Sequence, residues 1–110
     1  MRRIIVSFCL SISVMYFVIN LSSFHKASSC DGVTPTYTEG VSTILNKNCA
    51  LSGCHVSGFV NGDFSTYSGA QSKKDDIKNM VEKKLMPPTG GLSDSDIQTI
   101  SCWVENDCPE

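Results

Sequence analysis

The sequence predicts an all-α domain, and three observations support this class. Apolar residues recur at helical spacing in three segments of the chain. No segment beyond residue 30 alternates polar and apolar residues with the period of two that marks a strand. Helix-capping residues precede the first and the last of these segments. At 110 residues the chain is long enough for one domain, which we place at residues 36–110.

The first helix is expected over residues 36–48. Thr36 and Glu39 have the spacing of a capping box, in which each side chain satisfies an unpaired backbone donor. One apolar face is formed by Val41, Ile44 and Leu45. Gly40 costs helix stability relative to alanine, so it marks either the close passage of another backbone or an exposed weak point.

The second helix is expected over residues 73–85, after a glycine- and serine-rich stretch. That stretch contains a turn at Asn61-Gly62 and about one helical turn at 65–69. The apolar stripe of the second helix consists of Ile77, Met80, Val81 and Leu85. The helix must end near residue 85 because Pro87 and Pro88 follow, and the residue before a proline avoids helical geometry.

The last helix has the strongest start signals. Ser93 is a capping residue with Asp96 three positions later, and Leu92 is placed to pack over Ile97 as a hydrophobic staple. The acidic residues also complement the positive end of the helix dipole. The buried face is expected to contain Ile97, Ile100, Trp103 and Val104.

Residues 1–29 have the layout of a secretory signal peptide. Two arginines precede an apolar run over residues 4–21, and Ala27-Ser28-Ser29 offers small residues for cleavage. The run is also long enough for a retained membrane anchor. Either arrangement places the rest of the chain outside the cytoplasm. Residues 30–35 then form a tether between the signal and the domain.

Cleavage before Cys30 changes the charge and the supply of metal ligands. Six lysines remain against eleven acidic residues, a net charge of −5, which argues against nucleic acid as a partner. His55 becomes the only histidine, and Met80 and Met86 become the only methionines.

The stretch CALSGCH, residues 49–55, carries the main functional signal. Haem c attachment needs two thiols that add to the vinyl groups and a histidine directly after the second thiol as the iron's proximal ligand. The usual spacing has two residues between the cysteines, whereas Cys49 and Cys54 are separated by four. The extra residues must loop outward, and Ser52-Gly53 supplies the freedom for this.

Two other interpretations of these residues remain open. A Cys49–Cys54 disulfide is chemically accessible in an oxidising compartment, and His55 would then be an ordinary surface residue. A zinc site is also open, with Cys102 and Cys108 joining His55 as ligands.

A haem iron with one histidine ligand needs a sixth ligand if it is to transfer electrons without binding small molecules. No second histidine remains after cleavage, so a methionine thioether is the natural candidate. Met80 lies on the apolar stripe of the second helix, where core packing is expected. Met86 follows the helix and precedes Pro87-Pro88, which stiffen the backbone beside it. We therefore expect Met86 as the distal ligand.

The chain resembles the small monohaem c-type cytochromes of the bacterial cell envelope. The resemblance covers residues 36–108 and rests on the order of NCALSGCH, GDFSTY, LMPPTGG and LSDSDIQTISCWVEND. It implies the cytochrome c fold, with crossing terminal helices and one covalent haem held by Cys49 and Cys54. It also implies His55 as proximal ligand and Met86 as distal ligand, with Gly40 allowing the first helix to approach the last near Trp103. The wider cysteine spacing departs from the family's usual pattern.

Three further cysteines need an explanation after cleavage. Cys102 and Cys108 are expected to form a disulfide, which requires that the last helix stops early; Cys30 pairing with Cys102 is the alternative. Cys30 would be the first residue after the signal, as in acylated bacterial lipoproteins. We therefore expect lipidation of Cys30 and anchoring on the periplasmic side of the envelope.

These expectations favour an electron carrier with unidentified redox donor and acceptor proteins. No nucleophile or general base is arranged as in an enzyme, so a non-enzyme is expected. Two alternatives remain: a haem sensor or weak peroxidase with an open iron site, and a haem-free, disulfide-stapled helical lipoprotein that acts as a binding module.

Overall fold

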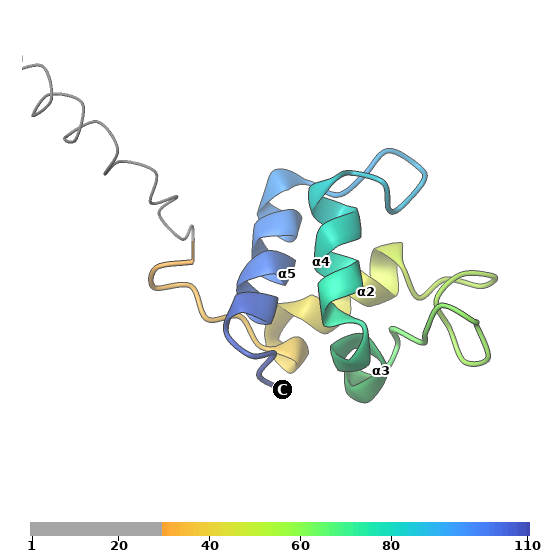
Figure 1. The fold of residues 1–110 in the computed structure, drawn as a ribbon, viewed down its shortest axis with the longest axis horizontal. Coiled ribbons are helices and arrows are strands. Elements are labelled where there is room, and N and C mark those ends of the chain that lie inside the picture. The colour runs from red at the N-terminus through yellow and green to blue at the C-terminus, as the bar shows by residue number, and fades with distance from the viewer. Residues whose placement is uncertain (1–29) are drawn as a thin grey trace, which may run out of the picture.

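The structure is a computed structural model that describes residues 30–110. It confirms the all-α class, since the described residues form helices and no strand. The elements are η2 (Tyr37–Val41), α2 (Ser42–Asn48), α3 (Tyr67–Ser72), α4 (Lys74–Glu82) and α5 (Asp94–Glu105). Helices α4 and α5 lie side by side and antiparallel, and η2 and α2 cross them (Figure 1).

The signal peptide predicted over residues 1–29 lies outside the described residues. Within residues 30–110, none of the helices has the length and apolarity that crossing a membrane requires.

The first predicted helix forms with a kink near its start. Thr36 is the cap, and its Oγ1 accepts a hydrogen bond from the Glu39 N–H at 3.0 Å. Glu39 and Gly40 leave helical geometry, and Gly40 has φ +139°. An ideal Cβ on Gly40 would lie 3.9 Å from the Thr99 side chain of α5, an ordinary contact. The predicted approach to the last helix is therefore present, but the backbone angle, not crowding, favours glycine here.

Helix α5 begins as its sequence predicts and supplies the centre of the core. The Ser93 hydroxyl accepts a hydrogen bond from the Asp96 N–H at 3.2 Å. Leu92, Ile100 and Trp103 are all buried. The buried apolar core around them also contains Tyr37, Val41, Leu45, Phe64, Ala70, Ile77 and Val81.

Helix α4 buries a narrower face than its sequence predicts. Ile77 and Val81, four residues apart, face the core, whereas Met80 and Leu85 are 40% and 58% exposed. The core packing expected for Met80 and Leu85 is wrong, because the helix ends at Glu82 and Met80 lies about 100° around it from Val81.

The disulfide joins Cys30 to Cys102, with 5.3 Å between the Cα atoms, and Cys108 is a buried free thiol. The predicted Cys102–Cys108 disulfide is therefore wrong, and the alternative partner of Cys102 is the one observed. The reason is the length of α5. The helix continues to Glu105, so Cys102 lies within it, and left-handed backbone at Asp107 and Cys108 turns the chain end back onto the core.

The same disulfide corrects two expectations for the N-terminal segment. The sulfur of Cys30 cannot hold both a lipid thioether and a disulfide, so lipidation of Cys30 is incompatible with this structure. Residues 30–35 are not a free tether, because Asn106 Nδ2 also donates a hydrogen bond to the Val33 carbonyl at 3.1 Å. The segment is held against the end of α5.

The C-terminal residues are held by aromatic side chains from distant elements. The Pro109 carbonyl accepts hydrogen bonds from the Tyr37 N–H at 2.9 Å and from Trp103 Nε1 at 3.0 Å. The Tyr67 hydroxyl donates to the Cys108 carbonyl at 2.8 Å. These bonds tie η2, α3 and α5 to the C-terminal residues.

Candidate haem-attachment site

Helix α2 places Cys49 at the start of the predicted attachment loop. The Cys49 N–H caps the helix by donating to the Leu45 carbonyl at 2.8 Å. Six residues later the chain returns, and the His55 N–H donates to the Cys49 carbonyl at 3.0 Å. This hydrogen bond joins the two ends of the loop and holds the backbone of His55 beside that of Cys49.

Inside the loop a tight turn presents the second cysteine to solvent. The Cys54 N–H donates to the Leu51 carbonyl at 2.8 Å, and Gly53 takes a left-handed conformation with φ +79°. No atom outside its chain neighbours lies within 4 Å of an ideal Cβ on Gly53, so the turn projects outward. The backbone freedom predicted for Ser52-Gly53 is therefore needed at Gly53, whose positive φ favours glycine.

The two thiols of the loop are free but differ in environment. Cys49 is buried, with 8% of its surface exposed, and burial together with the nearby Cys54 raises the pKa of its thiol to about 11. Cys54 is exposed. The loop therefore holds two unpaired thiols, and the Cys49–Cys54 disulfide considered from the sequence is not formed in this structure.

The His55 ring is held between two phenylalanines. It stacks on Phe64 with 4.0 Å between ring centroids and 8° between planes, and Phe59 meets it edge-on at 5.0 Å. The Phe64 N–H also donates to the His55 carbonyl at 2.9 Å. Backbone and ring contacts from Phe64 thus fix both the main chain and the plane of the imidazole.

One ring nitrogen of His55 lacks a hydrogen-bond partner, although the ring packs against two aromatic side chains. Its Nδ1 is buried and has no hydrogen-bond partner. Buried polar atoms in proteins nearly always have a partner, and an exception calls for an explanation such as an absent water or ion. A histidine that only packs in the core would be expected to bond both nitrogens. Within the described residues, this nitrogen is the buried side-chain nitrogen or oxygen that lacks a partner.

The methionines lie together at the C-terminal end of α4. The Met86 N–H donates to the Met80 carbonyl at 3.4 Å, which folds Met86 back over the last turn of the helix. The two residues are 39% and 40% exposed. The structure therefore groups Cys49, Cys54 and His55 in one loop and places Met86, beside Met80, on another.

Large apolar side chains are exposed mainly in these two regions. Figure 1 shows the loop before α3 and the loop after α4 projecting on the same side of the view. Seven large apolar residues are exposed within residues 30–110, and six of them lie in the segment 49–66 before α3 or in the segment 80–86 at and after the end of α4. The six are Leu51, Phe59, Val60, Met80, Leu85 and Met86. Exposed apolar side chains gathered in this way are typical of a ligand or partner site.

The zinc alternative lacks its ligands. Cys102 is bonded to Cys30, so it cannot join His55 and Cys108. In the part of the chain that the structure describes, no three His, Cys, Asp or Glu side chains are grouped as a metal ion would need. A covalent haem does not require such grouping, because its thiols bond to the porphyrin's vinyl groups and, of these three loop residues, only the histidine would bind iron.

Two residues of the site were not identified from the sequence. Phe64 stacks on His55, and Gly69 packs so closely that an ideal Cβ would lie 1.8 Å from the Asp63 carbonyl oxygen. The GDFSTY segment contains Phe64, but its spacing gives no indication of a partner nine residues earlier. The glycine of α3 has no sequence signal beyond its low helix propensity.

Comparisons of the chain with protein-family models, with curated proteins and with solved structures found no match.

Proposed function

We propose that this chain is an exported electron-transfer protein, not an enzyme, that carries one c-type haem. Cys49 and Cys54 are the attachment thiols, His55 is the proximal ligand of the iron and Met86 is the distal ligand. The fold proposed for the loaded protein is that of the small c-type cytochromes. Its redox donor and acceptor are other envelope proteins.

The observation that carries this proposal is the attachment loop. Two free thiols flank a turn that closes, through backbone hydrogen bonds, on a histidine with a buried and unpartnered ring nitrogen. A structural disulfide would use the thiols, and a packing histidine would have partners for its nitrogens. Covalent haem attachment would use both thiols, and His55 follows the second thiol directly, where a proximal ligand is needed.

The exposed apolar residues give independent support. Leu51, Phe59, Leu85 and Met86 expose 36% to 58% of their surfaces in the chain alone. A porphyrin is a large apolar body, and contact with it would remove such side chains from water at roughly 25 cal/mol per Å². The proposal therefore assigns these residues to the haem surroundings.

Export is supported by the disulfide. Cys30–Cys102 is a bond that persists in oxidising compartments and is rare in the cytosol. The haem-containing protein would gain and lose one electron at the iron, with the protein supplying ligands and an apolar environment. Phe64 holds the imidazole plane, and the thioether of Met86 raises the reduction potential.

Absorption spectra of methionine variants test the ligand assignment. The chain is expressed with haem-maturation machinery, and the oxidised protein is compared with Met86→Ala and Met80→Ala. We expect the weak sulfur-to-iron absorption band to disappear in Met86→Ala and to persist in Met80→Ala. The two residues have nearly equal exposure and are joined by a backbone hydrogen bond, so Met80→Ala is a matched control.

Carbon monoxide separates this function from a haem sensor. With His55 and Met86 both bound, the reduced protein at neutral pH does not bind carbon monoxide. Binding by the wild-type protein would show an open iron position and would contradict the electron-transfer proposal. Loss of the sulfur band in Met80→Ala alone would move the ligand role to Met80.

A further inference from the structure

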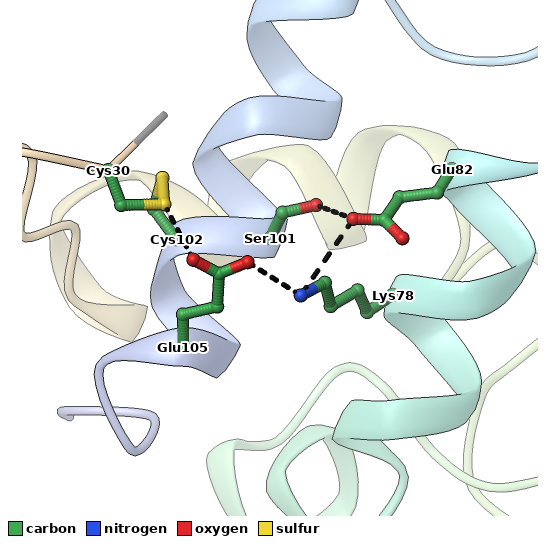
Figure 2. Close-up of polar contacts among 6 residues, drawn as sticks. All are labelled: Cys30, Lys78, Glu82, Ser101, Cys102 and Glu105. Atoms are coloured by element: carbon green, nitrogen blue, oxygen red, sulfur yellow. Dashed lines mark hydrogen bonds and ion pairs between the residues drawn. A yellow bond between two sulfur atoms is a disulfide. The ribbon is translucent and has the colours of Figure 1, made fainter. Parts of the chain in front are cut away.

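The disulfide has a carboxylate against one of its sulfurs. Glu105 Oε2 lies 3.2 Å from Cys30 Sγ, and Figure 2 shows the carboxylate directed at this sulfur. A disulfide sulfur carries no proton, so it donates nothing to Glu105. The contact instead places a negative charge beside the sulfur of Cys30.

The carboxylate of Glu105 also belongs to an ion-pair network. Lys78 Nζ on α4 lies 2.7 Å from Glu105 Oε1 and 3.9 Å from Glu82 Oε1. The Ser101 hydroxyl, next to Cys102 in the chain, donates to Glu82 Oε1 at 2.8 Å. The network connects α4 to α5 through two contacts, Lys78 with Glu105 and Glu82 with Ser101, as Figure 2 shows. Lys78 thus partly neutralises the carboxylate whose other oxygen lies against the disulfide.

Only one sulfur of the disulfide is open to attack from solvent. Cys102 is fully buried in α5, whereas Cys30 is partly exposed at the start of the described chain. A reagent thiolate would attack Cys30 Sγ, form a mixed disulfide there and release Cys102 as a thiolate, which is then protonated by water. A second reagent thiol, as thiolate, would attack the reagent's sulfur and release Cys30. Two reagent thiols are oxidised to a disulfide, and the protein disulfide takes up two electrons.

We propose that Glu105 is an electrostatic guard of the Cys30–Cys102 disulfide, which hinders reduction and exchange by thiolates, and that Lys78 moderates it. The incoming nucleophile is an anion, so the carboxylate repels it at the only accessible sulfur. The guard concerns thiols of any source, including those of other proteins in the envelope. It does not depend on the presence of haem, and its failure would leave the proposed function untouched.

The guard has a consequence for the remaining cysteines. Exchange of the disulfide with Cys54, the exposed free thiol, would scramble the pairing and consume an attachment residue. A disulfide that resists thiolates also resists exchange with Cys54. Glu105 would therefore protect the attachment loop without touching it.

Reduction rates of charge variants test the guard. The exported protein and its variants are treated with a thiol under native conditions, quenched with iodoacetamide, and the alkylation of Cys30 and Cys102 is followed by peptide mass spectrometry. We expect Glu105→Gln to be reduced about fivefold faster, the effect of one unit charge about 4 Å from the nucleophile in water. We expect Lys78→Met to be reduced more slowly, by a similar factor, because Glu105 loses its neutralising partner.

The pair of variants separates charge from structure. Both variants break the same ion pair, so a purely structural role predicts faster reduction in each, through looser packing of α4 on α5. Glu82→Gln is the matched control: it removes an acid from the same network but not from the sulfur, and we expect less than a twofold change. Faster reduction of both Glu105→Gln and Lys78→Met, or no change in Glu105→Gln, would overturn the proposal.

Reagents of different charge give a second readout. The ratio of Glu105→Gln to wild-type rates is measured with 3-mercaptopropionate, 2-mercaptoethanol and cysteamine, which carry a negative, no and a positive charge besides the thiolate. The guard predicts the largest ratio for 3-mercaptopropionate and the smallest for cysteamine, with all differences reduced in 1 M salt. Equal ratios for the three reagents would contradict the electrostatic explanation.

Discussion

Removal of the Cys30–Cys102 disulfide should cost this domain a large part of its stability. The bond links residues 72 positions apart, so it closes nearly the whole domain into one loop. In the chain-entropy description, a loop of this length restricts the unfolded chain by about 4 kcal/mol. A domain of this size has a total stability of about 4–12 kcal/mol. Loss of the bond should therefore lower the melting temperature by about 15–30 °C.

Cys30→Ser is the suitable variant, because Cys30 lies at the edge of the domain whereas replacement of the buried Cys102 would also disturb the core. Urea unfolding followed by circular dichroism gives the free energy of unfolding of both proteins in the same haem state. Reductant is the internal control: it should bring the wild-type protein down to the variant's stability and leave the variant unchanged. A difference below about 1 kcal/mol would refute the reasoning, since the segment 30–36 would then contribute little to the native state.

Three further predictions concern the attachment loop and helix α3. Gly69→Ala should lower the free energy of unfolding by about 3 kcal/mol in urea, because the added Cβ would overlap the Asp63 carbonyl oxygen. Ser68→Ala, on the exposed side of the same helix, is the control and should change the free energy of unfolding by less than about 0.5 kcal/mol. In the haem-free chain, iodoacetamide should modify Cys54 at pH 8 well before Cys49, because burial and the neighbouring thiol hold the pKa of Cys49 at about 11. The unfolded chain loses this thiol proton near pH 9 and the folded chain keeps it, so stability should fall as pH rises from 9 to 11. Equal modification of the two cysteines, or the same alkaline fall in Cys49→Ser, would contradict the assignment.

Local signals made the helix starts predictable. The caps at Thr36 and Ser93 form as expected because the side chain and the backbone donor that it satisfies are only three residues apart. The same short-range periodicity predicted the burial of Ile100 and Trp103, whereas Ile97 and Val104 are only partly buried. Features of this kind depend on neighbours along the chain, which the sequence displays directly.

The cysteine pairing depended on features that sequence spacing does not display. Cys102 and Cys108 are near in sequence, but α5 continues past Cys102 and the following left-handed turn directs Cys108 to the core. Cys30 reaches Cys102 across the whole domain. The exposure of Met80 was also not predictable, because the apolar stripe of α4 is wider than the core that covers it.

The attachment loop lies between these cases. The pattern of Cys49, Cys54 and His55 marks the candidate residues, but the closing hydrogen bond and the Phe64 stack come from the fold. The sequence likewise could not show that the two thiols remain free while another pair is oxidised.

Mass spectrometry of the tryptic peptide 48–73 tests the central claim most directly, on protein exported from cells that have haem-maturation machinery. We predict a coloured peptide whose mass is that of residues 48–73 plus one haem, with the haem joined to both Cys49 and Cys54. A colourless peptide in which these two cysteines are bonded to each other would contradict the account.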